Sequence, residues 1–166
     1  MTAANTSPMA QPPSQGPAGD SAQTLRVPPQ NIQAEASVLG SMIIHAPAID
    51  VVVQINQPEH FYRQAHQIIY QTLVDMSQAG KPVDLVTMRD ELDRRGQLEA
   101  VGGIDYLVML AEGVPSAANV EYYAKIVRDK ALLRQLIVVG TQIVQDAFDT
   151  HDEAGDVLDS AERSVF

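Results

Sequence analysis

The stretch from Val120 to Phe148 constrains the fold more than any other part of the chain, because it contains no proline and a single glycine, Gly140. At about 1.5 Å per residue it would form a helix about 44 Å long, more than a small domain can cover. We therefore predict one long helix with more than one packing partner, and Asn119 as its N-cap. Its apolar residues recur at helical spacing in two neighbouring rows: Tyr123, Ile126, Val127, Leu133, Ile137, Val144 and Phe148, and Tyr122, Leu132, Leu136, Val139 and Ile143.

A second amphipathic segment follows the long one after a polar turn at 149–152. A turn this short makes the two helices antiparallel neighbours, so we predict an αα-hairpin. The second helix is too short to cover the whole apolar face of the first, and large exposed apolar patches are rare on monomers. We therefore predict self-association through Leu132, Leu136, Val139 and Ile143. The residues of the second segment that share one face are Val157, Leu158, Ala161, Val165 and Phe166.

Upstream of the hairpin, the chain shows short helical patterns separated by glycine and proline. Asp84 is a candidate N-cap, Gly80 a candidate helix stop, and the small residues Ala36 and Gly40 would let another helix approach closely. The segment 48–55 holds three consecutive valines, which leaves helix and strand open. The helices we expect are 31–44, 64–79, 85–95 and 104–112. No segment shows sustained alternation with period two, so the predicted class is all-α: a compact head of short helices followed by a long αα-hairpin.

Residues 1–29 differ from the rest because they hold six of the ten prolines and only two charged residues, Asp20 and Arg26. A segment with so few large apolar residues cannot offset its ordering entropy, which favours a disordered tail over a polyproline recognition segment. The predicted organisation is a tail over 1–29, a helical head over 30–114 and a helical hairpin over 115–166.

Composition and motifs argue against most chemistry in this chain. Its net charge of −10 should repel DNA, and its lack of cysteine excludes disulfides and thiolate zinc sites. The only Gly-Lys pair, Gly80-Lys81, precedes a proline instead of the Ser or Thr of a phosphate-binding loop. His60 and His66 lack a third metal ligand, and the acidic residues near 146–162 lack calcium-loop spacing. We expect no catalytic, cofactor or metal site here. Without a membrane-length apolar run or a signal-peptide pattern, we also expect a cytoplasmic protein.

Several short motifs, in one order over about residues 26–166, resemble the N-terminal domain of the bacterial replicative DNA helicase, the DnaB family. They are Pro28-Pro29-Gln30-Asn31, Ala34-Glu35, Ser37-Val38-Leu39-Gly40, Phe61-Tyr62, His66, Asp84-Leu85-Val86-Thr87, Val101-Gly102-Gly103, Tyr106-Leu107, Pro115-Ser116-Ala117-Ala118-Asn119, Tyr123, Ile126-Val127-Arg128 and Ala161-Glu162-Arg163 with Val165-Phe166. One departure is His60, where the family usually has an acidic residue.

The resemblance implies that 48–55 is helical and that the parent protein continues past Phe166 into a RecA-like ATPase domain, where ATP and Mg would bind. It implies that hairpins pair between subunits, that a hexameric ring forms, and that the C-terminal domain of primase docks on its collar. DNA would be contacted only through the full ring. The alternative is the helicase-binding domain of a primase, or another helical dimerisation module.

For the primase site we predict Tyr106, Ile137 and Ile143. The Tyr106 ring can pack after Gly102-Gly103 while its hydroxyl stays hydrated, and the isoleucines lie along the long helix beyond the head. The alternative for all three residues is a place in the core.

Overall fold

The structure, a computed structural model, describes residues 26–114, 116–149 and 153–166, and none of these residues lies in a β-strand. The predicted all-α class is therefore confirmed, while most of the proposed tail lies outside the described residues. No helix of the described part is long and apolar enough to cross a membrane. In chain order the elements are α1 (Ile32–Ile44), α2 (Pro47–Val52), the 3-10 turn η1 (Pro58–His60), α3 (Gln64–Gln78), α4 (Leu85–Arg94), α5 (Gly103–Glu112), the 3-10 turn η2 (Ala117–Asn119), α6 (Val120–Asp149) and α7 (Ala154–Val165).

The helices begin and end largely where the local signals indicate. The Asp84 carboxylate accepts hydrogen bonds from the backbone N–H groups of Val86 and Thr87, both at 2.9 Å, and so caps α4. These bonds, that of Thr87 first, lower the pKa of Asp84. α3 stops before Gly80, whose φ of 65° is accessible to glycine without strain. The short polar and glycine signals therefore set these boundaries.

The segment 48–55 is the region that local propensity describes least well. Pro47 to Val52 forms the helix α2, with Ala48, Ile49 and Val52 buried and Val51 exposed. This spacing puts three side chains into the core from one face of a helix, which a strand of the same residues would not do. Tertiary packing has overridden the β propensity of Val51 and Val52, but the helix that the family resemblance implied for 48–55 ends at Val52, and residues 53–55 form a turn.

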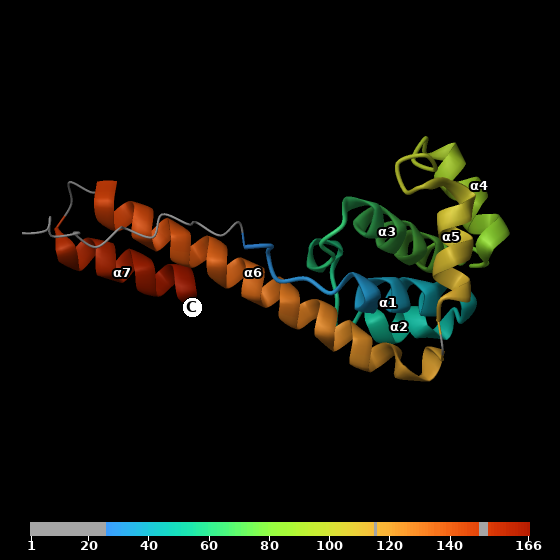
Figure 1. The fold of residues 1–166 in the computed structure, drawn as a ribbon, viewed down its shortest axis with the longest axis horizontal. Coiled ribbons are helices and arrows are strands. Elements are labelled where there is room, and N and C mark those ends of the chain that lie inside the picture. Colours follow the sequence, from blue (N-terminus) through green and yellow to red (C-terminus); the bar gives the residue numbers. More distant parts are fainter. Residues whose placement is uncertain (1–25, 115, 150–152) are drawn as a thin grey trace, which may run out of the picture.

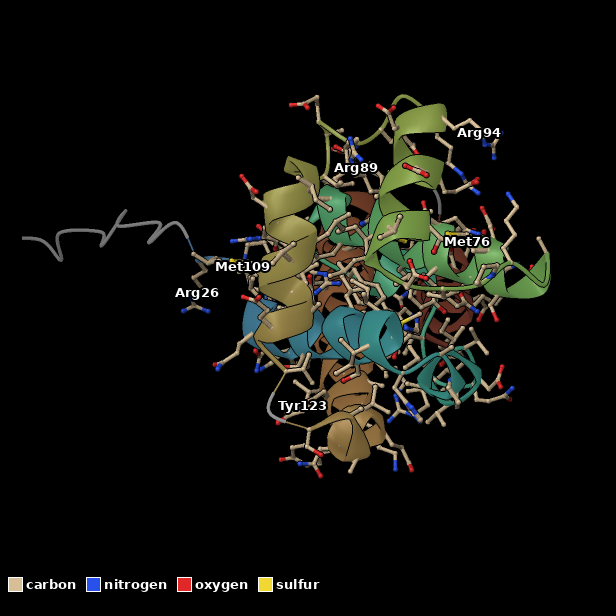
Figure 2. The ribbon with its side chains drawn as sticks, turned by 90° about the vertical axis from the view of Figure 1, so that its right-hand side faces the viewer. Arg26, Met76, Arg89, Arg94, Met109 and Tyr123 are labelled. Carbon is tan, nitrogen blue, oxygen red and sulfur yellow. The ribbon has the colours of Figure 1, made fainter. Side chains whose placement is uncertain are left out.

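α1 lies at the centre of the head and packs against α3, α5 and α6 (Figure 1). Gly40 allows the crossing with α5, since a Cβ there would lie 2.1 Å from the backbone oxygen of Leu110. The predicted close approach at Gly40 is thus confirmed. Figure 2 views the head along the long axis of the molecule and shows the exposed Met109 pointing from α5 away from the bundle. The core is mainly aliphatic, and its largest fully buried side chains include Phe61, Leu39, Met42, Ile49, Ile69, Leu73, Met76, Met88, Leu92, Leu107 and Leu110.

α6 leaves the head as one continuous helix of 30 residues, and α7 folds back along its far end (Figure 1). Its first turn continues directly from η2, so the expected N-cap Asn119 lies inside that 3-10 turn. The cap is provided three residues earlier by Ser116, whose hydroxyl accepts from the Ala118 N–H at 3.2 Å. The long hairpin is present, with its turn at 150–152 outside the described residues.

Candidate interaction surface

The first half of α6 belongs to the core of the head. Val120, Ala124, Val127 and Ala131 are buried at intervals of three or four residues, which places them on one face of the helix. Asn56 reaches this face, and its side-chain N–H donates to the carbonyl oxygen of Ala124 at 3.0 Å. The core therefore continues past residue 114, the boundary expected between head and hairpin.

The second half of α6 is different, because no described residue after Ala131 is buried. We call residues 132–149 together with α7 the stem. α7 packs against α6, and Val139 and Ile143 of α6, like Val157 and Ala161 of α7, are half-buried. Leu158, Val165 and Phe166 are exposed, so the single packed face expected for this segment is only partly realised. Leu158 lies to the side of the row formed by Val157 and Ala161, and Phe166 lies beyond the last residue of α7.

An apolar stripe on the stem remains open to solvent in the single chain. Leu132 is 52% exposed, Leu136 58% and Ile137 54%. Leu133, Val138, Val144 and Phe148 are exposed as well. The prediction that α7 leaves much of the long helix uncovered is confirmed. Of the residues expected to mediate self-association, Leu132 and Leu136 present more free surface than Val139 and Ile143, which are half-buried.

Charge is distributed unevenly along the long hairpin. The start of α6 carries four basic residues, Lys125, Arg128, Lys130 and Arg134, and only the acidic Glu121 and Asp129. The far end of the hairpin has, among its described residues, a single basic one, Arg163, and the acidic Asp146, Asp149, Glu153, Asp156, Asp159 and Glu162. One end of this rod is thus weakly positive and the other strongly negative.

Tyr106, the predicted aromatic anchor, occupies a different environment from the one expected. Its hydroxyl, expected to stay hydrated, lies 2.7 Å from Nε2 of His66, and the two rings are stacked with centroids 6.0 Å apart. His66 is fully buried, and its Nδ1 lies 2.6 Å from Oε2 of Glu35. The other Glu35 oxygen accepts the backbone N–H of Tyr62 at 2.7 Å. Tyr106 is therefore half-buried and fixed by a polar group that joins α5, α3 and α1.

A His66 tautomer with its proton on Nδ1 satisfies every partner in this group. Nδ1–H donates to the Glu35 carboxylate, and Nε2 accepts from the Tyr106 hydroxyl. Arg63 donates to the same Tyr106 oxygen across 3.4 Å. A buried polar network with all its members paired orients the helices that contribute to it.

The positions of Glu35 and His66 within their helices are a sequence signal for this group. Glu35 precedes the buried Val38, Leu39 and Met42 by three, four and seven residues, which puts a carboxylate on the core face of α1. His66 has the same relation to the buried Ile69, Tyr70 and Leu73 of α3. A polar residue at a core position needs a partner, and each of these two could have been paired with the other.

Neither histidine pattern forms a metal site in the described part of the chain, where no three potential ligands gather. His66 is committed to Glu35 and Tyr106. His60 lies in η1, and its Nδ1 accepts the backbone N–H of Gln57 at 3.3 Å. Burial, opposed by Glu59, lowers the pKa of His60.

The two arginines at the end of α4 are occupied by acidic partners. Arg94 and Arg95 both bind Glu91, and Arg95 also binds Asp75 at 2.8 Å. Lys81 approaches the other Glu91 oxygen at 3.0 Å. These hydrogen bonds, led by that of Arg95, lower the pKa of Glu91 to about 2. The cluster is a local ion network on the head.

Tyr106 and the stem lie on separate parts of the molecule. α5 belongs to the head, and the stem extends away from it on the other side (Figure 1). A single chain therefore does not bring Tyr106 together with Ile137 and Ile143, and a site that used all three would combine the head of one chain with the stem of another.

Comparison with known proteins identifies the family to which this chain belongs. The model of the DnaB-like helicase N terminal domain matches residues 27–129. The chain is 46% identical over 140 residues to the replicative DNA helicase DnaC of Bacillus subtilis (strain 168), covering 84% of this chain and 31% of that protein. It is 47% identical over 140 residues to DnaB of Geobacillus stearothermophilus, with the same coverage. The chain thus spans about a third of the length of these relatives.

Two solved structures share the fold. The N-terminal domain of DnaB helicase from Mycobacterium tuberculosis superposes with a TM-score of 0.77 at 45% identity, over 84% of this chain and 98% of that one. A DnaB-like replicative helicase, solved in a study of its interactions with primase, superposes with a TM-score of 0.65 at 26% identity, over 81% of this chain and 31% of that one.

Proposed function

Because the chain belongs to the family of the DnaB-like helicase N-terminal domain, we propose that it serves as the assembly and docking part of a replicative DNA helicase. In this function it associates with copies of itself through the stem, towards a hexameric ring, and presents a docking surface to the C-terminal domain of primase. The observation that carries the proposal is the open apolar stripe of Leu132, Leu136 and Ile137 on a helix rooted in the head core.

The same proposal assigns the remaining activities of a helicase to other parts of the parent protein. The sequence lacks a phosphate-binding loop, so ATP and Mg would bind in a separate ATPase domain. A net charge of −10 disfavours direct DNA binding, so DNA would be contacted by the assembled ring. Since chromosome replication in bacteria takes place in the cytoplasm, we place the protein there.

Self-association follows from the stem's apolar surface. Burying one leucine side chain is worth about 2 kcal/mol, so Leu132 and Leu136 on two chains would supply a substantial part of a stable interface. The charge distribution favours an antiparallel pair. In that arrangement the acidic end of one stem lies beside the basic start of the partner's α6, while a parallel pair would place two acidic ends together.

The test of self-association is the mass of the 166-residue chain in solution. Leu136→Asp places a charge in the stripe, so we expect the mass at micromolar concentration, measured by light scattering, to shift strongly towards the monomer. Val86→Asp is the matched control, because Val86 is also an exposed apolar residue of a helix, on α4 of the head. Val86→Asp should keep the wild-type mass. A folded Leu136→Asp variant that also keeps it would place the interface elsewhere.

Primase docking is supported by the structural likeness to a helicase studied in its interactions with primase. We propose that the docking surface combines α5 of one chain, through Tyr106, with the stem of a neighbouring chain, through Ile137 and Ile143. Ile137 offers more surface than Ile143, since Ile143 is half-buried. An aromatic anchor with aliphatic neighbours is the composition of a surface where few residues dominate binding.

Two substitutions distinguish the contribution of the Tyr106 ring to primase binding from that of its hydroxyl. Tyr106→Ala removes both, and Tyr106→Phe removes only the hydrogen bonds with His66 and Arg63. We expect Tyr106→Ala to weaken primase binding, measured by titration calorimetry, by about 1–2 kcal/mol and Tyr106→Phe to bind nearly as well as the wild type. Thermal unfolding is measured in parallel. If binding falls equally in both variants and follows the loss of stability, Tyr106 acts only within the head.

A further inference from the structure

Arg134 stands at the point where α6 leaves the head. The last buried residue of the helix, Ala131, lies one turn before it, and the exposed stripe begins beside it at Leu132. Among the hydrogen bonds of the described residues, those of Arg134 are the last along α6 to reach the head. The orientation of everything beyond this point depends on how the helix is held here.

The Arg134 guanidinium bridges two separate segments of the head. One N–H group donates to the carbonyl oxygen of Pro29, just before α1, and another donates to that of His60 in η1, both at 2.7 Å. The guanidinium carbon also lies 5.6 Å from the centre of the Tyr62 ring. The planar guanidinium presents its donors in a fixed fork, so two bonds to two segments restrict rotation as well as distance.

Tyr62 is itself held from the core side. Its backbone N–H donates to Glu35, whose other carboxylate oxygen binds the fully buried His66. The ring against Arg134 is therefore anchored to the same polar group that joins α1, α3 and α5. The contact between α6 and the head at this point is fixed on both of its sides.

We propose that Arg134 and Tyr62 form a clasp that sets the direction of the stem relative to the head, with both acting as positioning residues. The inference goes beyond the proposed function, because the clasp lies within one chain and would orient the stem in a monomer as well. Its effect grows with distance from the clasp. Residue 145 lies about 16 Å further along the helix, so a tilt of about 15° at the clasp would move it by about 4 Å.

The absence of cysteine allows a direct measurement of this direction in the 166-residue chain. Cysteines introduced at the exposed positions Asp93, on α4, and Gln145, in the stem, carry spin labels. Pulsed electron paramagnetic resonance then gives the distance between head and stem. Dilution with unlabelled chain restricts the signal to pairs within one molecule, so the readout does not depend on whether the stems associate.

Three variants test the clasp. In Arg134→Gln we expect the distance distribution to shift or broaden by about 4 Å, because the fork and its charge are lost. Arg134→Lys keeps the charge without the fork and should behave like Arg134→Gln. Lys130→Gln removes the same charge one turn earlier and should match the wild type.

The clasp is refuted if folded Arg134→Gln retains the wild-type distribution, or if Arg134→Lys restores it. Circular dichroism shows that each variant is folded. Light scattering of the same samples reports self-association separately, so a failure of the clasp is distinguishable from a failure of the proposed interface.

Discussion

The two halves of α6 have similar apolar patterns, but one half is buried in the head and the other is exposed. Val127, in the first half, is 1% exposed in the core of the head, and Leu136, in the second half, is 58% exposed on the stem. Both residues lie in helical apolar rows of one uninterrupted helix. The pattern indicates which faces require cover, and only the tertiary structure shows whether the same chain provides it. A face covered internally stabilises the fold, whereas an uncovered one is available for assembly.

We expect the largest effect from the same substitution, to aspartate, made once in the buried half of α6 and once in its exposed half. Val127→Asp would bury an unpaired charge among Val120, Ala124 and Ala131, so we expect it to lower the free energy of unfolding by about 4 kcal/mol. Leu136→Asp should leave that free energy of the monomer nearly unchanged while it dissociates the assembly. Urea denaturation, at protein concentrations low enough to keep the chains monomeric, measures the free energy of unfolding of both variants. Equal losses in the two variants would contradict the division of α6 into a core half and an assembly half.

Substitutions at two glycines, one in the head and one in the stem, should have effects of intermediate size on the free energy of unfolding. Gly40→Ala would push a Cβ to 2.1 Å from the Leu110 carbonyl oxygen, and we expect a loss of about 1–3 kcal/mol from the forced separation of α1 and α5. Gly140 has no heavy atom within 4 Å of the corresponding Cβ position, so Gly140→Ala should stabilise the monomer by up to about 1 kcal/mol.

The readout for both glycine variants is the midpoint of urea unfolding, with oligomer mass measured alongside. A neutral Gly40→Ala would show that the α1–α5 crossing relaxes without cost. Weaker association of Gly140→Ala would show that a partner chain packs closely at this point of the stem.

The smallest effect concerns pH, and it should be confined to the head. The pKa of Glu91 is lowered from its ordinary value of 4.5 to about 2 by Arg95, Lys81 and Arg94. The stabilisation by this carboxylate is therefore fully present above pH 4.5 and is lost as the pH falls from 4.5 towards 2. Unfolding of Glu91→Gln, followed in the same pH range, should depend less on pH than that of the wild type. Identical pH profiles would show that these ion pairs contribute nothing measurable.

Much of the fold could be predicted because its signals are local. The Asp84 cap, the stop at Gly80 and the spacing of apolar residues place α3, α4 and α6 to within a few residues. The helical conformation of Val51 and Val52 could not be predicted this way, since α2 forms because Ala48, Ile49 and Val52 reach the core together. The N-cap expected at Asn119 failed for a related reason, because a 3-10 turn extends the helix upstream to a cap at Ser116.

The candidate site was predicted in part. The spacing of the long helix and the shortness of its hairpin partner predicted an open face at Leu132 and Leu136, and the structure confirms this exposure. The partner of the Tyr106 hydroxyl could not be read from spacing near Tyr106, because His66 lies 40 residues earlier in the chain. The role of Arg134 could not be predicted either, because it binds backbone carbonyl groups, which every residue carries and which give no sequence signal. The roles of Tyr106, Ile137 and Ile143 in docking stay a prediction.

The continuity of α6 has a consequence for the way folding and assembly are linked. A helix gains most of its stability from tertiary packing, and in α6 the last residue buried in the head is Ala131, beyond which α7 packs on the helix. In a monomer the hydrogen bonds of the stem therefore open locally at a lower free energy than those of the head, from the far end inward. A partner on the stripe raises that free energy along the whole stem. Hydrogen exchange of this one helix would thus report the stability of the head near Val120 and the occupancy of the proposed interface near Leu132 and Leu136.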